Sequence, residues 1–366
     1  MAQSTRTFPL DAQGWTPALF DELLTPLHPE TRVRATRVVD SKLYGDGMVS
    51  TAGRLLFDLD YDANPDSLPS RMMVKIAKDE HTSPLYDNEV AFYTRLRPEL
   101  DIETPRCFGG NFDPESRTFA LLMEDLSVRG ITFPNVTVPV AVDSIRDLLR
   151  TLARLHARTW NSPRLSGDLG WIQHHMRGEL HHFFHDADKV PASTAYQVET
   201  EQHKREMVER LGLTVDQLYE GFRAVQAHQS GLAQCVLHGD THIGNTYLLP
   251  DGSGGLLDWQ LFSVGYCMHD VSYIIATGLS VGVRRQHERE LLAFYLDALR
   301  SAGVADAPTF DEAWTEYRRA HVWNVYVGWL TTPVVNYGWQ INVMAHLRVM
   351  TAFEDCETGK LLAQMR

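Results

Sequence analysis

Hydrophobic and polar positions follow two different periods along this chain. In the first third, apolar and polar residues alternate over short runs, which is the pattern of half-buried β-strands. We expect five strands in this part, over residues 33–44, 53–61, 71–77, 104–109 and 119–124. A turn at residues 111–114, which end in an Asp-Pro pair, would separate the last two strands.

Helical periodicity dominates the rest of the sequence. Two helices are expected among the early strands, over residues 17–27 and 85–96, and from residue 139 onward apolar residues recur at helical spacing. The exception is a strand-turn-strand pattern at residues 246–257, which contain Pro-Asp-Gly and Gly-Gly turn signals. A strand-rich first part and a mainly helical second part predict an α+β fold.

The residues before and after that hairpin carry chemistry. Asp240 and Asn245 precede it, and Asp258 follows it 13 residues after the asparagine. A hairpin of this length would bring Asp258 back beside Asn245, so both side chains can hold one Mg²⁺ on the phosphates of ATP. Asp240 would accept or orient the proton of a substrate hydroxyl. These roles together predict phosphoryl transfer.

The motif His238-Gly239-Asp240-x-His242-x-x-Asn245, with Asp258-Trp259-Gln260 behind it, resembles the aminoglycoside phosphotransferase and choline kinase superfamily. With Gly265 and Asp270 following, it is most similar to the ecdysteroid-kinase-like small-molecule kinases. The resemblance implies a protein-kinase-like two-lobed fold, with a small antiparallel sheet lobe and a larger helical lobe. Residues 1–126 would bind nucleotide and end in the hinge, and residues 127–366 would carry catalysis and substrate binding.

The same resemblance assigns nucleotide contacts in the first lobe. Lys75 lies on the expected third strand, with Glu89 as its partner in the following helix, and their ion pair would point the ammonium at the phosphates. Main-chain groups near Glu124 and Leu126 would bind the adenine edge, so ATP and GTP are not distinguished.

A glycine-containing loop between the first two strands is the expected phosphate cradle. Gly45 and Gly47 allow main-chain amides to approach phosphate oxygens, and Ser50 adds a hydroxyl donor. A Gly-x-Gly in a hairpin is usually only a turn, but here it precedes the strand that carries the lysine.

Four further polar residues have assigned roles. His242 stands where protein kinases have a lysine that assists the transferred phosphate, so its imidazole either donates to phosphoryl oxygens or packs the loop. His238 is expected to brace the loop, and Asp270 to tie it to the following helix. His156 lies among apolar positions of a helix over residues 148–160 and is expected to be a core histidine.

A histidine-rich stretch at residues 174–185 offers a rival chemistry. His181 and His185 are four residues apart, the spacing that lets two imidazoles bind one metal on a helix. The motif lacks the glutamate of His-Glu-x-x-His, so a polar helix face is the more ordinary interpretation. A pseudokinase without turnover is a second alternative, although it would normally have lost one of the three catalytic residues.

The acceptor class stays open between two kinds of molecule. Aromatic residues are frequent in the last third, and they favour a sugar, a glycoside or a sterol-like alcohol; they are Trp314, Tyr317, Trp323, Tyr326, Trp329, Tyr337 and Trp339. Acidic residues in the same region would suit an aminoglycoside; they are Asp311, Glu312, Glu316, Glu354 and Asp355.

The amino-acid composition limits the kinds of partner that this protein is expected to bind. Lysine and arginine number 34 against 47 acidic residues, a formal net charge of −13, which argues against a nucleic-acid or anionic membrane surface. Four scattered cysteines, no signal-peptide pattern and no apolar run that spans a bilayer predict a cytoplasmic protein. We expect a monomer or a weak homodimer that acts on a hydroxylated small molecule.

Overall fold

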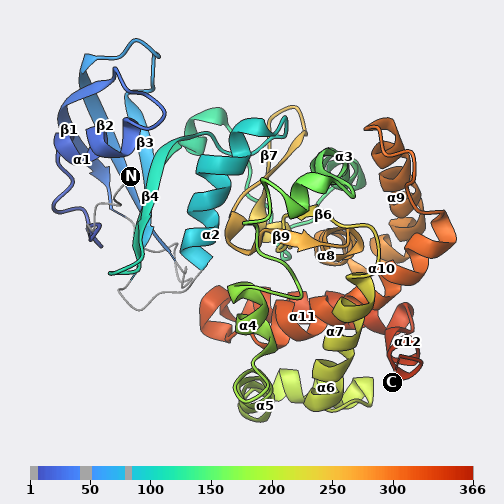
Figure 1. Cartoon of the computed structure of the whole chain (residues 1–366). Coiled ribbons are helices and arrows are strands. Elements are labelled where there is room, and N and C mark those ends of the chain that lie inside the picture. Colours follow the sequence, from blue (N-terminus) through green and yellow to red (C-terminus); the bar gives the residue numbers. More distant parts are fainter. Residues whose placement is uncertain (1–6, 42–51, 79–84, 366) are drawn as a thin grey trace. The chain divides into compact units, whose positions relative to one another are not determined.

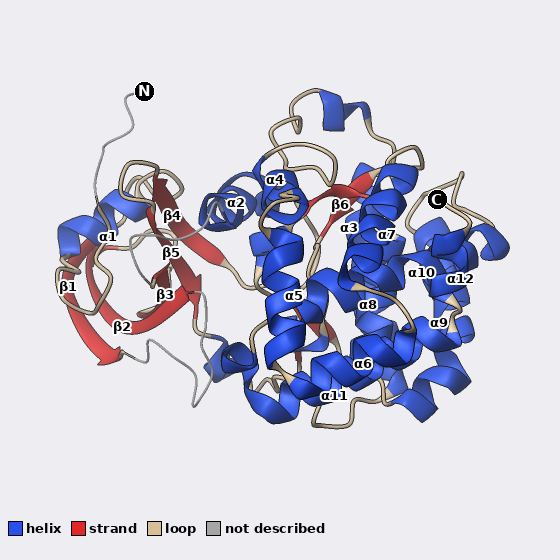
Figure 2. Cartoon of the chain, turned by 90° about the horizontal axis from the view of Figure 1, so that it is seen from below, coloured by secondary structure: helices blue, strands red, loops and turns tan. Residues whose placement is uncertain are grey.

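The computed structural model of the chain describes residues 7–41, 52–78 and 85–365. Gly45, Gly47 and Ser50 therefore lie outside the described residues. The chain divides into two compact units, which are Met1–Leu100 with Thr104–Ile131, and Asp101–Glu103 with Thr132–Arg366. Strands gather in the first unit and helices make up most of the second, so the α+β class is confirmed (Figure 2).

The first unit is built on one antiparallel sheet with the strand order β1-β2-β3-β5-β4 (Figure 2), of which Figure 1 labels β1, β2, β3 and β4. Its strands are β1 (Arg32–Asp40), β2 (Ala52–Ala63), β3 (Arg71–Ala77), β4 (Cys107–Asp113) and β5 (Thr118–Glu124). The bounds of β3 are those predicted from the sequence. Lys75 of β3 pairs in register with Arg54 of β2 on one side and Leu121 of β5 on the other, so the lysine lies on the central strand.

Helix α1 (Pro17–Leu24) closes one face of this sheet. Thr16 caps its first turn by accepting from the Leu19 amide, and Pro17 stands at the first helical position, where a missing N–H costs nothing. Phe20 packs edge-on against Phe57 of β2 with ring centroids 5.3 Å apart. The helix ends three residues before the predicted end, and Leu27 is 40% exposed.

The hairpin that joins β4 and β5 corrects the predicted turn. Strand β4 continues through Asn111 to Asp113, whereas the sequence favoured a turn at residues 111–114 and a strand ending at 109. The Asp113 carboxylate accepts from the Glu115 and Ser116 amides, and Arg117 adopts a left-handed backbone with φ 55°. The true turn therefore begins after Asp113, because that side chain satisfies the amides on its far side.

The predicted helix 85–96 is also modified. Helix α2 (Leu85–Ala91) passes into a wider π-helical turn over Phe92–Leu96, followed by a 3-10 turn over Arg97–Glu99. Glu89 is in the regular part, where it is fully buried.

The second unit holds two small antiparallel pairs of strands among helices. Strands β6 (Cys235–Leu237) and β9 (Ser263–Gly265) form one pair, and β7 (Thr246–Leu248) and β8 (Gly254–Leu256) form the predicted hairpin. Gly254 and Gly255, which were expected in its turn, belong instead to β8, where they pair with Leu248 and Tyr247. The first four helices are α3 (Val142–Thr159), α4 (Glu179–His185), α5 (Val190–Thr200) and α6 (Gln202–Leu211). The others are α7 (Val215–Gln229), α8 (Met268–Gly278), α9 (Val281–Ser301), α10 (Phe310–Val325), α11 (Val334–Asp355) and α12 (Thr358–Ala363), with a π-helical turn, η7 (Tyr326–Leu330), after α10.

Helix α8 is the centre of the second unit. All of its residues are buried, and it packs against α3, α9, α10 and α11. Helix α11 is broken at Gly338, whose φ of 77° and ψ of 165° only glycine adopts readily. No helix in the described ranges combines the length and apolar character that crossing a bilayer requires.

Candidate functional site

The segment from His238 to Thr241 is held by one buried carboxylate. Asp270, in the first turn of α8, accepts from the His238 amide at 2.7 Å and from the Gly239 amide at 2.9 Å. The Thr241 hydroxyl donates to the Asp270 carbonyl at 2.8 Å. Because every group in these bonds is buried, the bonds are shielded from water and hold the loop in this conformation.

Two histidines complete this support. His156 of α3 is fully buried and lies 3.1 Å from Asp270 through Nε2 and 2.8 Å from the Tyr295 hydroxyl through Nδ1. It is the core histidine that the sequence predicts, and it also orients the carboxylate. His238 braces the loop as expected, because its Nε2 lies 3.0 Å from the Leu257 carbonyl and its Nδ1 accepts from the Asp240 amide at 3.2 Å.

Gly239 is required by both its conformation and its surroundings. Its φ is 84°, and a Cβ on this residue would come within 2.0 Å of the Leu261 carbonyl oxygen. A side chain here would push the loop away from the segment that follows Asp258. The glycine of the motif is therefore architectural.

Asp240 and Asn245 contact each other directly. The amide nitrogen of Asn245 donates to the Asp240 carboxylate at 2.9 Å and to the Asp240 carbonyl at 3.0 Å. Since the nitrogen makes both bonds, the amide oxygen of Asn245 is the atom that can coordinate a cation. The contact also fixes one carboxylate oxygen of Asp240.

The β7–β8 hairpin returns the chain to Asn245. The Leu257 amide donates to the Asn245 carbonyl at 3.0 Å, and Asp258 is the next residue. Asp258 has a left-handed backbone, with φ 66° and ψ 69°, and precedes a 3-10 turn over Trp259–Leu261. A non-glycine residue in this conformation stores strain, which is common at functional sites.

Burial sets the protonation of the loop. Burial raises the pKa of Asp240 to about 6; the charge of His242 opposes this rise and that of Asp258 adds to it. Burial lowers the pKa of His242, so its imidazole is neutral near pH 7. Burial alone would raise the pKa of Asp270, but the hydrogen bond and charge of His156 bring it down to about 2.

His242 lies between the loop and a wall of aromatic rings. Its Nδ1 accepts from the Gly244 amide at 3.1 Å, so the ring proton is on Nε2. That nitrogen is 3.9 Å from the Asp240 carboxylate and is buried without a hydrogen-bond partner. The rings around it belong to Tyr273, Trp329 and Tyr337, with centroids 5.8 to 6.0 Å away.

The sequence does not predict this ring wall. Tyr337 and Trp329 are among the aromatic residues expected to favour a ring-bearing acceptor, Tyr273 is not, and nothing in their spacing indicates that they meet at His242. They come from α8, η7 and α11, up to 95 residues away along the chain from His242 to Tyr337. The signal of the ring wall in the sequence is the high frequency of aromatic residues in the last third.

In the first unit, Lys75 and Glu89 form the predicted ion pair. The ammonium donates to the carboxylate at 2.7 Å, and the two residues are 4% and 1% exposed. Desolvating two charges offsets most of their attraction, so a buried pair of this kind contributes little to stability.

The end of β5 holds the two residues expected near the adenine edge. The Glu124 amide donates to the Arg106 carbonyl at 3.0 Å, and its carboxylate accepts from the Arg106 amide at 2.9 Å. Leu126 begins a 3-10 turn that Asp125 caps through the Ser127 amide. The main chain therefore turns sharply directly after β5.

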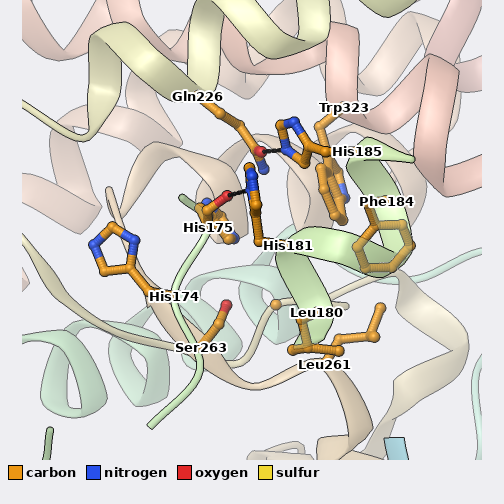
Figure 3. A pocket seen from close by; sticks show the side chains of 11 residues that line it. His174, His175, Leu180, His181, Phe184, His185, Gln226, Leu261, Ser263 and Trp323 are labelled. Carbon is orange, nitrogen blue, oxygen red and sulfur yellow. Dashed lines mark hydrogen bonds between the residues drawn. The ribbon is translucent and has the colours of Figure 1, made fainter. Parts of the chain in front are cut away.

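The histidine-rich stretch lines a narrow pocket in the second unit (Figure 3). His181 contacts the His175 carbonyl at 2.8 Å and His185 contacts Gln226 at 2.6 Å, so each imidazole has a partner within the protein. The other side of the pocket includes Gly239 and Trp323. Throughout the described ranges, no group of three or more histidine, cysteine or acidic side chains has the geometry to hold a metal ion.

Comparison with known proteins identifies a family. The model of the phosphotransferase enzyme family matches residues 61–314, which is more than half of the chain. No curated protein matches the sequence.

Solved structures match this chain at low sequence identity. An aminoglycoside-3'-phosphotransferase of type VIII is 17% identical, with 82% of this chain and 98% of that chain covered and a TM-score of 0.42. A choline kinase from Streptococcus pneumoniae is 11% identical, with 92% and 98% covered and a TM-score of 0.40. A macrolide 2'-phosphotransferase from Brachybacterium faecium is 15% identical, with 91% and 97% covered and a TM-score of 0.43. At these identities the acceptor of this chain does not follow from those names.

Proposed function

The chain belongs to the phosphotransferase enzyme family, and we propose that it transfers the γ-phosphate of Mg²⁺-bound ATP to a hydroxyl of a small organic molecule. It is a small-molecule kinase by family. The observation that carries the more specific proposal is the Asp240–Asn245 contact at 2.9 Å, beside the hairpin that returns the chain at Asp258. The hydroxylated acceptor, the use of ATP and the roles below belong to the proposal.

Asp240 would receive the acceptor. Its carboxylate accepts the hydrogen bond of the incoming hydroxyl and orients the oxygen toward the γ-phosphorus. The transition state of such transfers is loose, so orientation and charge neutralisation contribute more than base strength. The bonds from Asp270 to the His238 and Gly239 amides support this role, because they hold the loop that carries Asp240.

Asn245 and Asp258 would hold Mg²⁺. An amide oxygen and a carboxylate are the hard ligands this ion prefers, and substrate phosphates and water complete its shell. Bound there, the ion would neutralise charge on the phosphates. The Leu257–Asn245 main-chain bond supports the pairing, because it brings the two ligand positions to the same end of the hairpin.

The nucleotide would be bound by residues of the first unit. Lys75, directed by Glu89, would bind its phosphates, and main-chain groups near Glu124 and Leu126 would bind its base. Gly45, Gly47 and Ser50, outside the described residues, would cover the phosphates. GTP is an alternative donor, since a base held by main-chain groups leaves no side-chain signature.

His242 would assist the transferred phosphoryl group. The neutral imidazole has its Nε2 proton buried without a partner, 3.9 Å from the Asp240 carboxylate, and such a donor is costly unless something binds it. Replacing His242 with alanine should lower the turnover number about tenfold or more. An unchanged turnover number would leave it a packing residue.

A pseudokinase is the alternative that remains. Asp240, Asn245 and Asp258 are all present in the geometry described, which supports an active enzyme. The metal-enzyme alternative rests on the histidine-rich stretch, in which the imidazoles of His181 and His185 already bond to the protein. A cytoplasmic location and a monomer or weak homodimer stay predictions.

The experiment is a mass-spectrometric screen for phosphorylated products. The protein, Mg²⁺ and ATP are incubated with hydroxylated metabolites, glycosides, sterols and aminoglycosides, and Asp240→Asn is run in parallel. The exposed Asp297→Asn serves as the matched control, because the same chemical change is made far from the loop in sequence. We expect products with wild type and the control, and a rate about 10² to 10⁴ lower with Asp240→Asn. ATP binding without any product would favour the pseudokinase.

A further inference from the structure

We infer that Tyr295 is a positioning residue of the candidate site, and that its hydroxyl holds His156 near pH 7 as the neutral imidazole whose Nε2–H donates to Asp270. The tyrosine thereby joins the support of the loop that carries Asp240. Its effect on turnover rests on the proposed phosphotransferase function. These four residues all belong to the second unit.

Three helices bring the supporting side chains together. His156 lies on α3, Asp270 on α8 and Tyr295 on α9, and these helices pack against one another. All three residues are fully buried. In such surroundings a polar atom without a hydrogen-bond partner is costly, so each proton among these groups needs an acceptor.

The hydroxyl of Tyr295 has one proton to donate, and the His156 ring is its best acceptor. The hydroxyl oxygen lies 2.8 Å from His156 Nδ1. The Cys267 thiol is a second hydrogen-bonding neighbour of the hydroxyl, but sulfur is a weaker acceptor than an imidazole nitrogen. Burial raises the pKa of Tyr295 well above its usual range, so the hydroxyl keeps its proton and donates it to Nδ1.

A donor at Nδ1 decides which ring nitrogen of His156 carries the proton. Because Nδ1 accepts, the proton of the neutral ring is on Nε2. That nitrogen lies 3.1 Å from Asp270 Oδ2, which can only accept when the carboxylate is ionised. The opposite tautomer would turn the lone pair of Nε2 toward the carboxylate and set Nδ1–H against the tyrosine hydroxyl.

The Asp270 carboxylate then has donors at both of its oxygens. Oδ2 accepts from His156 Nε2 and from the His238 amide at 2.7 Å, and Oδ1 accepts from the Gly239 amide at 2.9 Å. A change of tautomer at His156 would remove one of these three bonds and let the carboxylate turn away from the amides. Tyr295 thus acts on the loop through His156 and Asp270.

Two neighbouring imidazoles use their protons elsewhere. His238 and His269 each direct Nε2 to a main-chain carbonyl, at 3.0 Å and 2.9 Å. Burial lowers the pKa of both rings, so they are neutral near pH 7. Of the three imidazoles whose charge acts on Asp270, His156 is therefore the one that donates to its carboxylate.

In acid the His156 ring takes up a second proton. Nδ1–H then donates to the Tyr295 oxygen, and the hydroxyl proton turns toward the Cys267 sulfur. Against the rise due to burial, the hydrogen bond and charge of this imidazolium bring the pKa of Asp270 down to about 2. The neutral ring is thus the form near pH 7, and the charged ring is the form in acid.

Nuclear magnetic resonance of the imidazole nitrogens tests the inference without turnover. The protein is labelled with isotope-enriched histidine, and long-range proton–nitrogen correlations near pH 7 show which nitrogens of His156 carry a proton. His156→Gln identifies the signals by their loss. We expect the Nε2–H form in the wild-type protein. An Nδ1–H form or an imidazolium at this pH would overturn the inference.

Tyr295→Phe is the second arm, because it removes the hydroxyl and keeps the ring. We expect part of the Nε2–H form of His156 to be replaced by a form with a proton on Nδ1, and unchanged signals would contradict the role of Tyr295. Tyr317→Phe is the matched control, since Tyr317 is equally buried and its hydroxyl lies 3.3 Å from Glu288. The same change in this control would show that the loss of any buried hydroxyl alters His156, which also contradicts the inference.

Turnover tests the part that rests on the proposed function. ADP release from Mg²⁺-ATP is measured with water as the acceptor. Tyr295→Phe should lower kcat about tenfold and leave the KM for ATP unchanged, as expected of a residue that orients another, and Tyr317→Phe should match the wild type. An unchanged kcat in Tyr295→Phe would contradict the positioning role. Absence of Mg²⁺-ATP binding in the wild type would contradict the proposed function instead, and the imidazole signals would still decide the form of His156.

Discussion

Two requirements on the Asp240 side chain oppose each other: the stability of the fold and the chemistry proposed for the site. Burial raises its pKa to about 6, and the neighbouring Asp258 charge adds to the effect, yet in the role proposed for it the carboxylate must be ionised to accept the proton of a hydroxyl. Its side chain is 26% exposed, so the burial is incomplete. The residue is thus held close to its own titration point, which is where a general base works best.

A pH–rate profile tests this at the residue scale. We expect kcat to fall about tenfold per pH unit as the pH drops below about 6, since only the ionised fraction of Asp240 is productive. Bound Mg²⁺ would stabilise the ionised carboxylate, and the fall in kcat would then begin at lower pH. A profile that is flat between pH 5 and 8, with chemistry rate-limiting, would exclude Asp240 as the titrating group.

Stability gives an independent test of the same residue. A raised carboxyl pKa means that the folded state binds the proton more tightly than the unfolded state. The contribution of Asp240 to stability is therefore present below about pH 4 and is lost as the pH rises through about 6. Replacing it with asparagine removes this loss, and we expect the free energy of unfolding at pH 7 to rise by about 1–2 kcal/mol, discounted for partial exposure.

Urea unfolding of wild type and Asp240→Asn measures this difference. At pH 4 the wild-type side chain is largely protonated, so the gain should nearly vanish. A gain of the same size at both pH values would show that the charge is not its source.

At the scale of elements, α8 and the loop of residues 238–241 are joined through Asp270. Replacing Asp270 with asparagine would leave the buried His238 and Gly239 amides competing for one carbonyl and would remove the charge beside His156. We expect the free energy of unfolding to fall by about 2–4 kcal/mol. Chemical denaturation measures it, and the exposed Asp297→Asn should change stability by less than about 0.5 kcal/mol.

The contact between Asp270 and His156 also accounts for part of the loss of stability at low pH. The pKa of Asp270 is lowered to about 2, so its contribution is present above about pH 4 and is lost as the pH falls through about 2. In Asp270→Asn this part of the acid transition should be absent. A variant with the full wild-type acid sensitivity would mean that other carboxylates account for it.

At the scale of the whole molecule, nucleotide binding should stabilise the protein against heat. A ligand at 100 times its Kd adds about 2.7 kcal/mol to the free energy of unfolding, which for a protein of this size raises the melting temperature by a few degrees. We expect this rise with Mg²⁺-ATP and its loss on adding EDTA, measured by differential scanning calorimetry.

Single substitutions show how much each proposed contact contributes to this rise in melting temperature. Lys75→Met should reduce it by removing a phosphate contact, and Asp258→Asn should remove its Mg²⁺ dependence. Glu220→Gln, an exposed acid that pairs with Arg223 on α7, is the control and should retain the full rise. An undiminished rise in both Lys75→Met and Asp258→Asn would contradict the proposed binding residues.

The elements that sequence reasoning predicted correctly are those determined by local patterns. Strand β3 has its predicted bounds because a short apolar run lies between the proline-containing turn at residues 64–69 and the polar residues that begin at Lys78. The β7–β8 hairpin and the burial of His156 were likewise readable from short-range spacing. The β4–β5 turn was placed wrongly, because the Asp-Pro signal marks a turn but not which side of the aspartate it begins on.

What the sequence by itself determined is a local arrangement: an aspartate and an asparagine in contact, and a hairpin that returns the chain to that asparagine directly before a second aspartate. These residues are near one another along the chain, so local geometry is enough to bring them together. Tertiary structure alone decided the surroundings of that motif, which are the Asp270 support and the wall of Tyr273, Trp329 and Tyr337 around His242. Those side chains come from helices 30 to nearly 100 residues away, and which faces of packed helices meet is set by the filling of the whole core, not by any one segment.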